Sequence, residues 1–198
     1  MNIGVIGMGT GTIAAYGLPG DYVRFYELNP GVEDLVSGQN AWFSYVNESK
    51  ARVDIVLGDA RLSLERELQQ GKPQNFDVLI LDAFNGDAIP VHLLTVEAFQ
   101  TYLQHLAPGG VLLVHVSSST LDLSPVLLAI TRKLELSAAM AYSADPASSI
   151  SSIWVLFARN PELLRTPALR RSARPLDQGQ RPVLWTDDHT DITRLLYH

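Results

Sequence analysis

The chain has 198 residues, of which 46% are hydrophobic and 18% charged, so it is long enough to form one α/β domain with a substantial core. Its formal net charge of −6 argues against a general nucleic-acid-binding protein, which normally presents a basic face to the phosphates. The absence of cysteine excludes disulfides and thiolate metal sites, and it fits a cytoplasmic location.

Short apolar runs alternate with helical patterns, which is typical of a mostly parallel sheet with helices on both faces. The strand patterns lie near residues 2–7, 22–27, 53–57, 77–81, 111–116, 138–143 and 152–158. The helical patterns lie near residues 10–16, 30–47, 60–70, 91–106 and 121–135. The connection between the last two strands is too short for a parallel crossover, so these strands should form an antiparallel hairpin. We therefore expect a Rossmann-like, seven-stranded sheet of the methyltransferase type.

The pattern predicts a single domain over residues 1–198, with a core over 1–158 and a C-terminal extension over 159–198. The chain enters a glycine-punctuated strand with no basic segment before it, so we expect no secretory leader. The frequent glycines in the first 20 residues also make a membrane-spanning helix improbable. We expect no membrane contact by this chain itself.

The most informative motif is the glycine-rich turn that follows the first strand and contains Gly7, Gly9 and Gly11. Such a turn lets a ligand approach the backbone closely, and an acid about 20 residues further on can accept hydrogen bonds from both ribose hydroxyls. Glu27, at the end of the second strand, has that spacing. A dinucleotide fingerprint would have its third glycine at Thr12, so the spacing favours an adenosyl ligand over NAD.

Two further carboxylates follow apolar strands. Asp59 comes after the third strand, where it could accept a hydrogen bond from the amino group of adenine or cap the next helix. Asp82 comes after the fourth strand and begins a polar loop over residues 83–90, which is typical of a substrate gate but also of an ordinary turn. Ligands of open α/β sheets bind beyond the carboxyl ends of the strands, so these positions are candidates for a site.

Other polar residues favour structural roles. His92 is predicted to lie on the surface at a helix start, and His115 to be a hydrogen-bonded imidazole in the core or at a strand end. Adjacent residues on an extended chain point in opposite directions, so the run 187–189 is not expected to bind a metal. We expect no metal site, and we expect Trp185 to anchor the C-terminal segment by burial.

Five blocks in order along the chain resemble the catalytic domain of spermidine synthases, the polyamine aminopropyltransferases. The blocks are Gly7 to Thr12, Phe25 to Pro30, Leu57 to Arg61, Phe76 to Asp82 and Leu106 to Gly110. The resemblance covers about three quarters of the chain, from Ile3 to about Phe157. It implies that the β-rich N-terminal domain of that family is absent, because this chain starts at the first strand of the sheet.

The resemblance implies roles for individual residues. The backbone of the glycine turn, at Gly7, Gly9 and Gly11, would contact the nucleoside. Glu27 would bind the ribose, and Asp59 with Ala60 would bind the adenine. Asp82 would be the catalytic carboxylate beside the attacking amine.

The sequence also departs from the family pattern. An acid that meets the aminopropyl end of the co-substrate falls on Thr10, and a second loop acid falls on Asn85. This leaves Asp87 as a shifted substitute near the substrate.

Three hypotheses follow. The first is aminopropyl transfer from decarboxylated S-adenosylmethionine to a polyamine-type amine, and the second is methyl transfer from S-adenosylmethionine. The third is a domain that binds the nucleoside without turnover. The expected partner is a small-molecule amine and not a nucleic acid, and a homodimer is left open.

Overall fold

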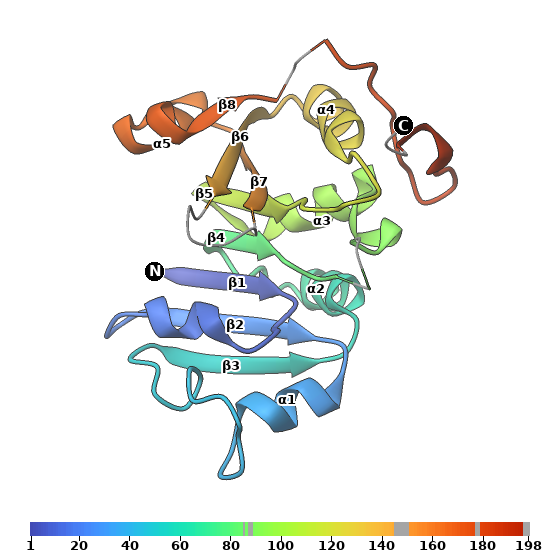
Figure 1. The fold of residues 1–198 in the computed structure, drawn as a ribbon. Coiled ribbons are helices and arrows are strands. Elements are labelled where there is room, and N and C mark those ends of the chain that lie inside the picture. Colours follow the sequence, from blue (N-terminus) through green and yellow to red (C-terminus); the bar gives the residue numbers. More distant parts are fainter. Residues whose placement is uncertain (85, 87–88, 145–150, 177–178, 196–198) are drawn as a thin grey trace. The chain divides into compact units, whose positions relative to one another are not determined.

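The computed structural model describes residues 1–84, 86, 89–144, 151–176 and 179–195 (Figure 1). The chain forms two compact units. The first contains Met1–Ala83 and Gln104–Gly110, and the second contains Phe84–Leu103 and Val111–His198. Strand β5 (Leu106–His115) has residues in both units.

The first unit is built on four parallel strands with their ends at a common edge. The strands are β1 (Asn2–Ile6), β2 (Tyr22–Glu27), β3 (Arg52–Leu57) and β4 (Phe76–Leu81). Their order is β3-β2-β1-β4, and their arrowheads point the same way in Figure 1. The central strands β1 and β4 end in fully buried apolar residues, as expected for parallel strands that are covered on both faces.

One face of β2 carries a charged network rather than an apolar surface. Arg24 donates to Glu67 of helix α2 (Ala60–Gln69) at 2.6 Å and to Asp54 of β3 at 2.5 Å. The Tyr26 hydroxyl donates to the other oxygen of Glu67 at 2.9 Å. Because an Arg24 without these carboxylates would be a partly buried unpaired charge, the network fixes α2 against this face of the sheet.

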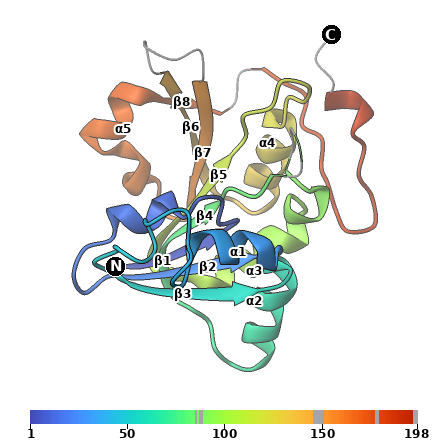
Figure 2. The same cartoon turned by 60° about the horizontal axis from the view of Figure 1, so that its bottom comes forward.

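The first predicted helix is a short 3-10 helix, η1 (Thr12–Tyr16). The helix predicted near 30–47 is much shorter, because α1 (Pro30–Val36) ends at Ser37, whose backbone is extended. The chain then folds back, and the N–H groups of Trp42 and Phe43 both donate to the Leu35 carbonyl. The prediction of a helix to residue 47 was therefore wrong. Figure 2 shows α1 over the strands of this unit.

His105 joins two segments of the first unit from a fully buried position (0% exposed). Its Nδ1 accepts from the Gln74 N–H at 3.1 Å, so its Nε2 carries the proton and donates to the Leu64 carbonyl at 3.0 Å. Burial lowers the pKa of this imidazole. The neutral ring therefore ties α2 to the segment that enters β4.

The second unit contains antiparallel strands. β6 (Ser137–Ala144) pairs with β7 (Ser151–Ala158) as the predicted hairpin, and β7 also pairs with β5. A short strand, β8 (Ala173–Pro175), pairs with β6 and was not predicted. The complete strand order is β3-β2-β1-β4-β5-β7-β6-β8, which confirms the mostly parallel sheet with antiparallel strands at its C-terminal end.

The helices of this unit are α3 (Val96–His105), of which residues 96–103 lie in the second unit, α4 (Ser124–Lys133) and α5 (Pro167–Ser172). Short 3-10 segments are η2 (Val91–Leu93), η3 (Pro161–Arg165) and η4 (Thr193–Leu195). Trp185 is buried, and its carbonyl accepts from the Val96 N–H at 3.0 Å, which confirms the predicted anchor of the C-terminal segment. Within the described part of the chain, no helix is long and apolar enough to cross a membrane.

Candidate functional site

The candidate site lies at the carboxyl edge of the strands of the first unit. The register aligns Ile6 with Tyr26 on one side and with Leu81 on the other, so the residues that follow β1, β2 and β4 emerge side by side. Glu27 in turn pairs with Leu57, the last residue of β3. Since neighbouring strands are about 4.8 Å apart, the ends of β2 and β4 flank the end of β1 at about 10 Å from each other.

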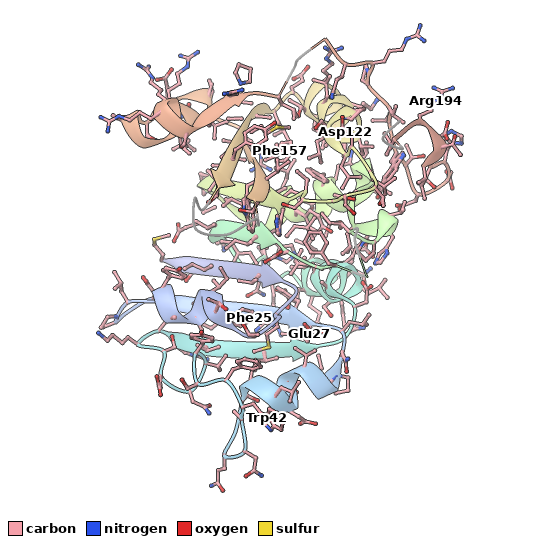
Figure 3. All side chains as sticks on the ribbon, in the orientation of Figure 1. Phe25, Glu27, Trp42, Asp122, Phe157 and Arg194 are labelled. Carbon is pink, nitrogen blue, oxygen red and sulfur yellow. The ribbon has the colours of Figure 1, made fainter. Side chains whose placement is uncertain are left out.

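Glu27 lies at this edge with its carboxylate held by the backbone on both sides (Figure 3). Oε2 accepts from the Met8 N–H at 2.9 Å, and Oε1 accepts from the Asn29 N–H at 2.8 Å. The residue is 8% exposed. A carboxylate offers about four lone-pair directions, so two remain for a ligand after these two bonds. The predicted link between the glycine turn and the acid of the second strand therefore exists as a direct hydrogen bond.

The glycine turn needs glycine at Gly7 for two reasons. Its φ is +90°, and a Cβ at this position would lie 2.4 Å from the Asp82 carbonyl oxygen. Gly9 also has a positive φ, +52°, but a Cβ there would meet no described atom within 4 Å. The turn is thus packed against the residue after β4 at Gly7 and has free space at Gly9, where a ligand could contact the backbone.

Asp59 follows β3 and caps the next helix. Its Oδ1 accepts from the Leu62 N–H at 2.9 Å, so it is the N-cap of α2, and Ala60 is the first residue of that helix. The capping role that the sequence left open is therefore present. This bond uses one of the two carboxylate oxygens, Oδ1.

Asp82 is positioned by the backbone of β1. Its N–H donates to the Ile6 carbonyl at 2.9 Å, which continues the β1–β4 ladder beyond the last strand residue. Its side chain is partly exposed at the same edge as Glu27. Asn85 and Asp87 lie outside the described residues. Thr10 is exposed, and its hydroxyl shares a 2.8 Å hydrogen bond with the Thr12 hydroxyl.

The other polar candidates have the structural surroundings expected for them. His92 is exposed in η2, and His115 stacks on Trp154 with centroids 4.4 Å apart. Asp187 accepts from the Thr95 hydroxyl at 2.8 Å, which connects the C-terminal segment to the start of α3. Among the described residues, no three His, Asp or Glu side chains gather in a way that could hold a metal.

Three polar side chains with structural contacts were not singled out from the sequence: His105, which is buried, and Asp122 and Gln180, which are half-buried. Asp122 accepts from the Ser124 N–H at 2.9 Å, and the Asp-x-Ser-Pro pattern was a readable signal for a helix start. Gln180 donates from Nε2 to Asp122 at 2.8 Å across 58 residues of sequence. No local pattern could have indicated that contact.

No family model matches the chain. A curated polyamine aminopropyltransferase from Vibrio vulnificus is 32% identical over 119 residues, a match that covers 59% of this chain. The chain spans only 38% of the length of that relative.

Two solved structures show how widely the fold is shared. A probable spermidine synthase from Corynebacterium glutamicum has a TM-score of 0.62 and 22% identity, over 93% of this chain and 72% of that one. Human methyltransferase-like protein 13, solved in complex with SAH, has a TM-score of 0.58 and 18% identity, over 94% of this chain and 85% of that one.

The fold is therefore the one shared by methyltransferases and spermidine synthases. The sequence resemblance to polyamine aminopropyltransferases is confirmed by the curated relative.

Proposed function

We propose that this chain binds an S-adenosylmethionine-type nucleoside at the carboxyl edge of β1 to β4 and transfers an aminopropyl group from it to a polyamine-type amine. The observation that carries the proposal is the Glu27 carboxylate, fixed by the N–H groups of Met8 and Asn29 beside the open glycine turn. The similarity to a polyamine aminopropyltransferase supports the choice of reaction.

In this proposal the ends of β1, β2 and β3 each contact one part of the nucleoside. Glu27 accepts hydrogen bonds from the two ribose hydroxyls with its remaining lone pairs, and Gly9 leaves room for the ligand at the turn. Gly7 and Gly11 have no such room, because a Cβ at Gly11 would lie 2.7 Å from the Val46 side chain and one at Gly7 would lie 2.4 Å from the Asp82 carbonyl oxygen. Asp59 and Ala60 meet the adenine at the start of α2. Decarboxylated S-adenosylmethionine is the proposed co-substrate for aminopropyl transfer, and S-adenosylmethionine for the alternative reaction.

The proposed chemistry needs a base more than it needs activation of the leaving group. A protonated amine cannot attack, so the Asp82 carboxylate accepts its proton and orients the free lone pair. The amine nitrogen then forms a bond to the carbon next to the sulfonium, and the carbon–sulfur bond breaks. Its electron pair stays on sulfur, which leaves neutral methylthioadenosine. Asn85 and Asp87 are proposed to contact the amine.

One observation favours a methyltransferase as the second candidate. Thr10 is an exposed, neutral residue whose hydroxyl is bonded to Thr12. It stands where the resemblance implies an acid for the ammonium of the decarboxylated co-substrate. Without that acid, selectivity against intact S-adenosylmethionine is reduced. A domain that binds the nucleoside without turnover is the remaining alternative.

The deciding experiment incubates the purified chain with putrescine and each co-substrate in turn, and identifies the products by mass. The proposal expects methylthioadenosine and an aminopropylated amine from decarboxylated S-adenosylmethionine. Methyl transfer alone would establish the second candidate, and binding without any product would establish the third. We further propose that the chain acts in the cytoplasm on a small-molecule amine, with no nucleic-acid partner.

A further inference from the structure

The second unit contains a pocket of about 130 Å³ that the proposed function does not use. Its polar lining comes from Asp122, Ser124, Tyr142 and Gln180, and apolar side chains such as Met140 and Leu176 complete the wall. These residues come from the start of α4, the hairpin strand β6 and the segment after β8. A cavity of roughly this size, about 150 Å³, can hold a molecule as large as benzene.

The orientation of the Gln180 amide is fixed by its neighbour. The Asp122 carboxylate can only accept, so the NH₂ group of Gln180 must face it, as the 2.8 Å contact to Oδ2 shows. The Gln180 carbonyl oxygen, Oε1, is consequently turned away from Asp122. It is buried and has no hydrogen-bond partner within the described parts of the chain. A buried acceptor without a partner costs free energy, and a donor that reached it would remove that cost.

The donors of the adjacent helix start are already used. The Ser124 N–H donates to Asp122, and Pro125 has no N–H. The N–H groups of Val126 and Leu127 both donate to the Leu123 carbonyl. The start of α4 therefore offers an anion none of the free backbone donors that such a site needs.

The charge of the lining has one sign. Asp122 supplies a carboxylate, and the described lining contains no Lys, Arg or His. The pocket thus combines a negative charge with aliphatic walls, and Gln180, whose carbonyl oxygen is buried and unsatisfied, is part of its lining. We propose that it binds a small protonated amine, a primary alkylammonium ion whose N–H groups meet Asp122 and Gln180 and whose carbon chain contacts Met140 and Leu176.

This second site can be tested separately from the nucleoside site. The chain has only three methionines. Met140 lines the pocket, whereas Met8 donates its N–H to Glu27 at the nucleoside site. We would label the methionine methyl groups of the whole chain with ¹³C and titrate with n-butylammonium chloride, monitoring both resonances by NMR. Butanol at the same concentrations and sodium chloride at matched ionic strength are the ligand controls.

The proposal expects a saturable shift of the Met140 methyl resonance with butylammonium and a much weaker response to butanol, with Met8 unmoved. Asp122→Asn should weaken butylammonium binding at least tenfold, which corresponds to about 1.4 kcal/mol. Gln180→Leu, which keeps the carboxylate, should also weaken it, whereas Asp188→Asn outside the lining should not. If Asp122→Asn does not fold, Gln180→Leu alone carries the test.

An unsaturable or absent Met140 shift would overturn the proposal, because the pocket would then hold only water. Equal responses to butanol and butylammonium would also overturn it, because binding would then not depend on the ammonium group. Titration with methylthioadenosine reports on the other site. The proposed function expects it to move Met8 and not Met140, so the two proposals can fail independently.

Discussion

The Met8 N–H donates to the Glu27 carboxylate at 2.9 Å, and this bond joins the turn after β1 to the end of β2. It determines where a ribose could be held, because the carboxylate cannot rotate without losing either this partner or Asn29. The same bond gives Glu27 a structural role beside its proposed binding role. A variant of Glu27 must therefore be tested for both stability and binding.

Glu27→Ala should abolish nucleoside binding. A ligand at 100 times its dissociation constant stabilises a protein by about 2.7 kcal/mol, which is about 5 to 10 °C in Tm at this chain length. We expect that shift for the unmodified chain with S-adenosylmethionine or methylthioadenosine and none for the variant. Because the variant also loses two backbone contacts, its Tm without ligand should fall. Asp34→Ala on α1 is the matched control and should keep the full shift; an undiminished shift in the Glu27 variant would remove Glu27 from the site.

Gly7→Ala and Gly9→Ala should differ sharply, although both glycines have positive φ. The first places a methyl group against the Asp82 carbonyl and should destabilise the fold by about 3 kcal/mol or more. The second meets open space and should cost only about 1 kcal/mol, the penalty for a left-handed backbone. Urea unfolding measures both values. We expect Gly9→Ala to fold yet bind the nucleoside weakly, and unchanged affinity would show that no ligand uses the space at Gly9.

Asp82→Asn should separate binding from transfer. The amide keeps the size of the side chain but cannot accept the proton of an ammonium ion. We expect the nucleoside Kd to change less than about threefold and product formation to fall by about 100-fold or more. Calorimetry and product analysis by mass give the two values. Asp77→Asn, on the same strand, is the control, and full activity in the Asp82 variant would exclude this carboxylate as the base.

His105 should make the fold sensitive to mild acid. Burial lowers the pKa of the folded imidazole, so the unfolded chain binds a proton first as the pH falls. The stability that the neutral ring contributes is therefore complete above about pH 6.5, the ordinary histidine value, and is lost as the pH falls from there toward the folded pKa. Urea unfolding between pH 8 and pH 5 would measure this, with His105→Gln as the comparison, because a glutamine amide can donate and accept without titrating. Equal pH dependence in both proteins would contradict the assignment.

The mostly parallel sheet and the edge at which its strands end could be predicted because both follow from local patterns. Apolar runs ended in Glu27, Asp59 and Asp82, and parallel strands bring such ends to one edge. The end of α1 could not be predicted from the sequence. The helix is replaced by a hydrogen bond from the Trp42 N–H to the Leu35 carbonyl, which forms only after the chain folds back. The pocket at Asp122 could not be predicted for a related reason, because Gln180, the hydrogen-bond partner of Asp122, is distant in sequence.

A crystal structure of the chain with methylthioadenosine would test the proposed nucleoside site directly. We predict that both ribose hydroxyls lie within hydrogen-bond distance of the Glu27 carboxylate, about 2.5 to 3.0 Å, with the adenine beside Asp59 and Ala60. A nucleoside bound away from the turn at Gly9, or bound with no contact to Glu27, would contradict the proposed role of this carboxylate.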